Sequence, residues 1–172
     1  TGDVSVRRVN FNSTTTQITG PSISDLITTV DGPIKILSST GSIVINDGDG
    51  NGLGIRANGA GDVLLRTVAN NGDVIVNSDV LSGFGHVNLV AGDDILFNAD
   101  VATGTNLPNQ RGTVYVLVTN GSVDASSGVE MQSGTSITTA NGNVRVAADN
   151  EGDIRLGLIE AGTANVSLLA EG

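Results

Sequence analysis

The sequence predicts an all-β fold, a single-stranded parallel β-helix (β-solenoid) with a triangular cross-section. Three observations lead to this prediction. A short glycine-led phrase returns from one end of the chain to the other, apolar and polar residues alternate within it, and the apolar residues are aliphatic rather than aromatic. A turn marked by glycine and followed by a short strand, repeated at intervals, is typical of a solenoid. The function of a solenoid usually lies in its length and surface rather than in a single pocket.

The recurring phrase consists of a glycine, a small or acidic residue, and an aliphatic–x–aliphatic run. Its alternation has the period of two that a half-buried strand requires, and valine and isoleucine at the inward positions favour strands. No segment keeps the spacing of an amphipathic helix over three turns, so we expect no helix. The phrase occupies residues 2–6, 41–45, 61–65, 72–76, 112–116, 142–146 and 152–156.

The composition fits a narrow interior. Of the 172 residues, 38% are apolar, but only Phe11, Phe84, Phe97 and Tyr115 are aromatic. Aromatic rings supply much of the buried area of globular cores, whereas a narrow coil has room mainly for branched aliphatic side chains. The 24 glycines, against three prolines, fit many tight turns.

The length of one coil follows from laying two stretches of sequence over each other. Residues 72–91 read GDVIVNSDVLSGFGHVNLVA, and residues 92–104 read GDDILFNADVATG before the phrase RGTVYVLVT at 111–119. A unit of about 20 residues with three short strands is one coil of a triangular β-helix. About eight such coils, spaced about 4.8 Å apart, would form a rod about 40 Å long. The overlay predicts three inward stacks: Val74, Ile95 and Ile154; Val80, Val101 and Ile159; and Val87, Val114 and Val166.

The organisation along the chain is that of one solenoid over residues 1–172. The rhythm breaks at residues 12–19 and again at 105–111, where we expect a loop that bulges from a corner. Residues 123–150 contain strand phrases whose register is ambiguous. Solenoids need polar caps, and neither end of the sequence shows one. We therefore expect an uncapped segment, either part of a longer repeat protein or a subunit that stacks end to end.

The charge and the apolar pattern exclude several classes of partner. The chain has 18 acidic residues against eight Lys and Arg, a formal net charge of −10, so binding to the phosphate backbone of nucleic acid is not expected. No apolar run approaches the roughly 20 residues that span a bilayer, so this segment is not expected to insert into a membrane. The absence of Cys excludes disulfides and thiolate chemistry.

Polar residues mark the corners of the predicted coil. Asn46, Asn77 and Asn98 each close a strand phrase, and if they share a corner their amides can form a hydrogen-bonded ladder. Aspartates that follow phrase glycines would instead repel across coils by about 1 kcal/mol even at the dielectric constant of water. Solvation is the simplest outcome, and hydrogen bonds to the turn backbone or a shared cation are the alternatives. These aspartates are Asp3, Asp62, Asp73, Asp93 and Asp153.

The strongest metal candidate in the sequence is the segment 46–52, which reads NDGDGNG. Asp47, Asp49 and Asn51 alternate as the oxygen ligands that open a calcium loop do, and Gly52 permits the bend. The match then fails, because Asn58 stands where such a loop has its bidentate Glu. A polar solenoid turn would use the same residue types, so calcium at Asp47, Asp49 and Asn51 and a plain turn both remain open. No other cofactor is expected.

The sequence gives little basis for catalysis, and we expect no enzymatic activity. His86, the only histidine, is expected to face solvent, because no Ser and Asp partners can be read around it. Polysaccharide lyases and hydrolases do use parallel β-helices, with clustered carboxylates and basic residues in a groove. Here Arg66, Arg145 and Arg155 stand at isolated outward strand positions.

The phrases GDVIVNSDV, GDDILFNADVATG and TANGNVRVAADNEGDIRLGLIEAGTANVSLLAEG resemble the repeats of giant bacterial surface proteins of the filamentous-haemagglutinin type. The resemblance is one of repeat style and is best from Gly61 onward. It implies a right-handed parallel β-helix, export to the bacterial cell surface, and a role as a shaft or adhesive fibre. It transfers no functional residue to this chain, because such repeats share no catalytic motif.

The function expected from these observations is that of a structural and adhesive shaft segment of an extracellular fibre. Its partners would be neighbouring coils or a second copy joined end to end, together with cell-surface glycans. The alternative is a carbohydrate-binding or polysaccharide-degrading β-helix, assisted by calcium. An ice-binding solenoid ranks last, because the Thr pairs of the chain do not share the spacing of the repeat.

Overall fold

The computed structural model describes residues 9–11, 14–16, 25–105, 107–120, 128–150 and 152–171, and all of its regular structure is β. The short strands β1 (Val9–Phe11) and β2 (Thr14–Thr16) form an antiparallel pair. Asp3 lies outside the described residues, and so does the polar break at 12–19 except for residues 14–16. No helix of the described ranges is long and apolar enough to cross a membrane.

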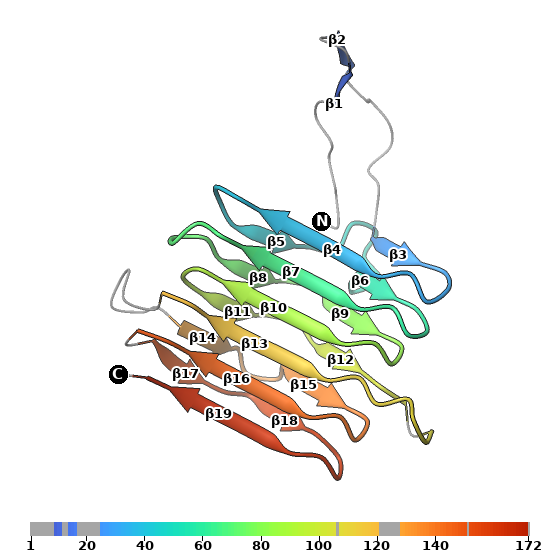
Figure 1. Ribbon diagram of the computed structural model, residues 1–172, viewed down its shortest axis with the longest axis vertical. Helices are drawn as coiled ribbons and strands as arrows, with labels where there is room; N and C mark the ends of the chain where they lie inside the picture. Colours follow the sequence, from blue (N-terminus) through green and yellow to red (C-terminus); the bar gives the residue numbers. More distant parts are fainter. Residues whose placement is uncertain are drawn as a thin grey trace.

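The remaining strands form three parallel sheets, each built from one strand of every coil (Figure 1). Sheet I contains β4 (Ile34–Ser38), β7 (Val63–Thr67), β10 (Val87–Ala91), β13 (Val114–Val118), β16 (Val144–Ala148) and β19 (Val166–Ala170). Sheet II contains β5 (Ile43–Ile45), β8 (Val74–Val76), β11 (Ile95–Phe97), β14 (Gly128–Met131) and β17 (Asp153–Arg155). Sheet III contains β3 (Leu26–Thr28), β6 (Leu53–Ala57), β9 (Asp79–Ser82), β12 (Val101–Thr103), β15 (Ser136–Thr139) and β18 (Leu158–Glu160).

This arrangement is the predicted parallel β-helix. The chain visits sheets III, I and II in turn, and each strand pairs with its counterpart one coil later. In Figure 1 the strands of sheet I lie nearest the viewer and run toward the left while successive coils descend, so the coil is right-handed. Parallel crossover connections have this hand almost without exception.

The coils are longer and fewer than expected. The paired residues Val74 and Ile95 are 21 positions apart, close to the predicted length, but Val101 and Ile137 are 36 positions apart. The largest sheets have six strands, so the described residues form six coils rather than eight. Only the strands must stay in register, and extra residues can bulge from a corner at small entropic cost. The loop expected at 105–111 is one such bulge and lies between β12 and β13.

The three predicted inward stacks are confirmed by the pairing of the strands. Ile95 pairs with Val74, Val101 with Val80, and Val87 with Val114. The segment of ambiguous register supplies the missing members, because Val129, Ile137 and Val144 each occupy one stack between residues that the overlay had aligned. The stacked side chains of the middle coils are buried, and together they form one continuous aliphatic core.

The glycine of the phrase is required at the corner before sheet I, where successive coils touch through their backbones. A Cβ on Gly85 would lie 2.2 Å from the carbonyl oxygen of Gly61, a distance that side chains do not tolerate. Buried hydroxyls complete this corner: Ser82 donates to the Gly61 carbonyl over 2.8 Å, and Thr103 donates to the Gly85 carbonyl. The glycines stacked in this way are Gly32, Gly61, Gly85, Gly112 and Gly142.

Candidate functional site

The loop between β5 and β6 contains the residues singled out for calcium. Asp47 folds the loop around its own carboxylate: Oδ1 accepts hydrogen bonds from the backbone N–H groups of Asp49 and Gly50, and Oδ2 accepts one from Gly52. Gly50 and Gly52 both have positive φ, as this tight path requires. These bonds, chiefly the one from Gly52, hold the pKa of Asp47 below its ordinary value, because they stabilise the charged form.

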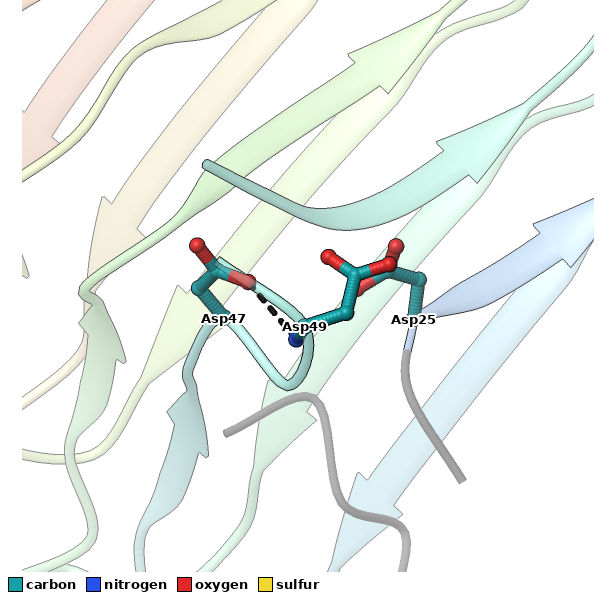
Figure 2. Close-up of side chains that lie close together, drawn as sticks. All are labelled: Asp25, Asp47 and Asp49. Atoms are coloured by element: carbon teal, nitrogen blue, oxygen red, sulfur yellow. Dashed lines mark hydrogen bonds between the residues drawn. The ribbon is translucent and has the colours of Figure 1, made fainter. Parts of the chain in front are cut away.

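The structure adds a third carboxylate that the sequence pattern did not reveal. Asp25, which directly precedes β3, lies with Asp47 and Asp49 so that one carboxylate oxygen of each falls within 4.8 Å of the others (Figure 2). One oxygen of Asp25, Oδ1, is buried without a hydrogen bond. Asp25 is 22 positions from Asp47, and the parallel pairing of β3 with β6 brings it to the loop.

Asn51 joins this group by hydrogen bonds. Its amide nitrogen donates to Asp25 over 3.0 Å, and its Oδ1 accepts the backbone N–H of Leu53 over 2.6 Å. Two of the three predicted ligands, Asp47 and Asp49, therefore converge with Asp25, while Asn51 links the loop to Asp25, the residue before β3. Calcium takes six to eight oxygen ligands. The three carboxylates offer part of such a set, so calcium binding stays a prediction of the sequence.

The aspartates at the other corners connect successive coils. Asp62 accepts a hydrogen bond from the backbone N–H of His86 over 2.7 Å, and Asp100 accepts one from Ser136 over 2.7 Å. Asp73 and Asp94, which form a second acidic group with the buried Asp93, follow the same pattern. Each donor lies one coil further along the chain. Hydrogen bonding between coils, rather than solvation alone, is therefore the role of these carboxylates.

The asparagine ladder is confirmed. The side-chain amide of Asn77 donates to Oδ1 of Asn46 over 2.7 Å, and Asn98 donates to Oδ1 of Asn77 over 2.6 Å. These three residues follow β5, β8 and β11 directly, so one corner of three successive coils is joined by side chains as well as by the sheets.

The residues considered for catalysis do not assemble with one another. His86 is exposed, as expected, and its Nδ1 lies 2.7 Å from Oγ1 of Thr113 on the next coil. Arg155 pairs with Asp153 on the surface, with 3.3 Å between Nη2 and Oδ2. Arg66 and Arg145 are exposed and form no ion pair with a described residue.

Two hollows along the described surface bear on catalysis. The larger, about 860 Å³, follows the ends of β12, β15 and β18, and Glu160 is the one ionisable residue in its lining. The smaller, about 560 Å³, lies beside Met131 and Leu158, and its lining contains no ionisable side chain. Neither hollow brings together the pair of carboxylates that glycoside hydrolysis uses.

Comparisons with known proteins identified no relative of this chain. No protein-family model matches the chain, and neither the curated proteins nor the solved structures contain a match to it.

Proposed function

We propose that this chain is a structural and adhesive shaft segment of a bacterial extracellular surface fibre, extended by stacking of β-helix coils end to end. The observation that carries the proposal is the open face of the last coil. Val166 and Leu168 of β19 occupy inward positions of sheet I, yet their exposed fractions are 45% and 51%. The equivalent first residue of β4, Ile34, is 5% exposed.

The exposed face combines apolar side chains with unpaired strand edges. β17, β18 and β19 each end their sheet, so each has one edge of backbone N–H and C=O groups that pairs with no described strand. Such edges are templates for further strands. A following coil, from the same polypeptide or from a second copy, would cover Ile159, Val166 and Leu168 and continue all three sheets.

The lateral surface supports a mechanical role. Backbone pairing ties each coil to the next in all three parallel sheets, and the asparagine ladder and the corner aspartates reinforce several of these junctions. The described hollows hold no constellation of nucleophile, base and acid. The extracellular location in the proposal comes from the similarity of the repeats to bacterial surface adhesins.

The stacking is tested by sedimentation velocity and negative-stain electron microscopy of the segment. We expect association that grows with concentration, and short rods in the micrographs. Leu168→Asp places a charge on the open face and should abolish the association. Val68→Asp is the matched control, because Val68 is 54% exposed but lies at a corner after β7. A segment that stays monomeric at all concentrations, or equal effects of the two variants, would contradict end-to-end stacking.

A further inference from the structure

The outer face of sheet I differs from the outer faces of the other two sheets. All six strands of sheet I have five residues, so their pleat presents two outward rows along the rod axis. The tyrosine row, as we call it, contains Lys35, Leu64, Asn88, Tyr115, Arg145 and Ser167. The aliphatic row contains Leu37, Arg66, Val90, Leu117, Ala147 and Leu169.

The charge of this face is opposite to that of the chain. The strands of sheet I contain three cationic residues, Lys35, Arg66 and Arg145, and no acidic one. The strands of sheets II and III contain one Arg and two acidic residues each. The whole chain carries a net charge of −10, so the cations of sheet I stand out against an acidic background.

These cations are also available to a ligand. Lys35, Arg66 and Arg145 are exposed, and the ion pair found among the described residues involves Arg155 of sheet II instead. At physiological ionic strength, charges more than about 8 Å away are largely screened. An anionic group within about 8 Å of one of these cations would therefore be attracted by it although the chain as a whole is acidic.

The order of side chains in the tyrosine row suits a linear ligand. Asn88, Tyr115 and Arg145 stand on successive strands, each about 4.8 Å from the next. The face of an aromatic ring is negative and attracts the polarised C–H bonds of an apolar ligand surface, such as one side of a pyranose ring. A guanidinium binds a carboxylate through two parallel hydrogen bonds, and an amide both donates and accepts.

The size of the face favours a polymer over a folded protein. Six five-residue strands cover about 400–500 Å² at the usual strand spacing and rise, about half of the roughly 800 Å² that each partner buries in a stable protein interface. From this chemistry we propose that the outer face of sheet I binds an acidic polysaccharide, with Tyr115 as the platform for a sugar ring and Arg66, Arg145 and Lys35 as the carboxylate-binding groups. The proposal is independent of the stacking of coils at the end of the rod.

The chain provides its own probe for this face. Tyr115 is the single tyrosine, and the chain has no tryptophan, so tyrosine fluorescence reports on sheet I alone. We expect oligogalacturonate, a linear polymer of uronic acid, to change this fluorescence saturably, and neutral dextran to leave it unchanged. Binding should weaken when salt is raised from about 50 to 500 mM, because the interaction depends on exposed charges.

Two double variants of equal charge separate the face from the rest of the molecule. Arg66→Gln with Arg145→Gln should weaken binding of oligogalacturonate by about tenfold, which corresponds to two exposed charge interactions. Arg56→Gln with Arg155→Gln removes the same charge from sheets III and II and should change it less than about twofold. Circular dichroism and thermal unfolding would be measured first, to check that both variants fold.

Three results would overturn the proposal. One is the absence of both fluorescence change and heat of binding with oligogalacturonate. Another is equal weakening by the two double variants, which would show a non-specific charge effect. The third is a concentration-dependent dimer in light scattering that only the Arg66 and Arg145 variant disperses, which would assign this face to a second copy of the chain.

Discussion

The first and last coils of the rod have the same strand positions but different burial. In the first coil, Ile34 of β4 and Ile43 of β5 are nearly buried. The last coil consists of β18 in sheet III and β19 in sheet I, and it has no described strand in sheet II. All five residues of β19 are exposed. An inward position in this fold is therefore not buried by its own strand. It becomes buried when three strands close the coil, because the first coil also ends its sheets but contains β3, β4 and β5.

The largest test of this comparison places one substitution at equivalent positions. Leu89 of β10 and Leu168 of β19 occupy the same inward position of sheet I, and Leu89 is fully buried. Leu89→Ala should lower the free energy of unfolding by about 2–5 kcal/mol through lost burial and a cavity. Leu168→Ala should cost less than about 1 kcal/mol, in proportion to the smaller area that it buries. Chemical denaturation of the monomer measures both, and equal costs would show that the last coil is closed.

The glycine corner provides the second test. A Cβ at Gly85 would meet the backbone of Gly61, whereas one at Gly41 would meet no atom within 4 Å. Gly85→Ala should cost about 1–3 kcal/mol, the usual penalty of overpacking, and Gly41→Ala should be neutral or slightly stabilising. Thermal unfolding of the two variants decides the matter.

The calcium prediction concerns the first coil, which the cluster of Asp25, Asp47 and Asp49 links to the second. A bound ion stabilises the folded state by mass action. The prediction requires that millimolar calcium raise the unfolding midpoint of the wild type, that magnesium do so less, and that Asp25→Asn remove the response. An unchanged midpoint in calcium would leave Asp47 as a residue that only holds its loop.

The smallest expected effect is the pH dependence due to Asp47. Its pKa is lowered in the folded state, so its contribution is present above the ordinary carboxyl pKa and is lost as the pH falls through the lowered value. Asp47→Ala should therefore unfold at a lower temperature than wild type at pH 7, and the two midpoints should converge in acid. Asp149→Ala, which removes a carboxylate without a hydrogen bond among the described residues, is the control. A difference that persists unchanged at the acid end would contradict the charged role of Asp47.

Much of the candidate site could be predicted from local sequence. The features that the sequence did not reveal all depend on the pairing of strands that are distant along the chain. Asp47 and Asp49 were found because alternating oxygens and glycines are a local pattern. Asp25 was missed because its approach to them depends on the pairing of β3 with β6. The cationic outer face of sheet I was missed for the same reason, since Lys35, Arg66 and Arg145 come from strands that are distant along the chain.

The sequence by itself determined the class of fold, the inward positions and the asparagine corner, because each depends on a period of two within short phrases and on residue types that recur. Only the tertiary structure decided the number of residues in each coil, the register of 123–150, the hydrogen bonds from corner aspartates to the next coil, and the contrast between the two ends. These features depend on which coil lies beside which. Corner loops can lengthen without disturbing the strands, so the spacing of phrases along the chain does not determine their stacking in space.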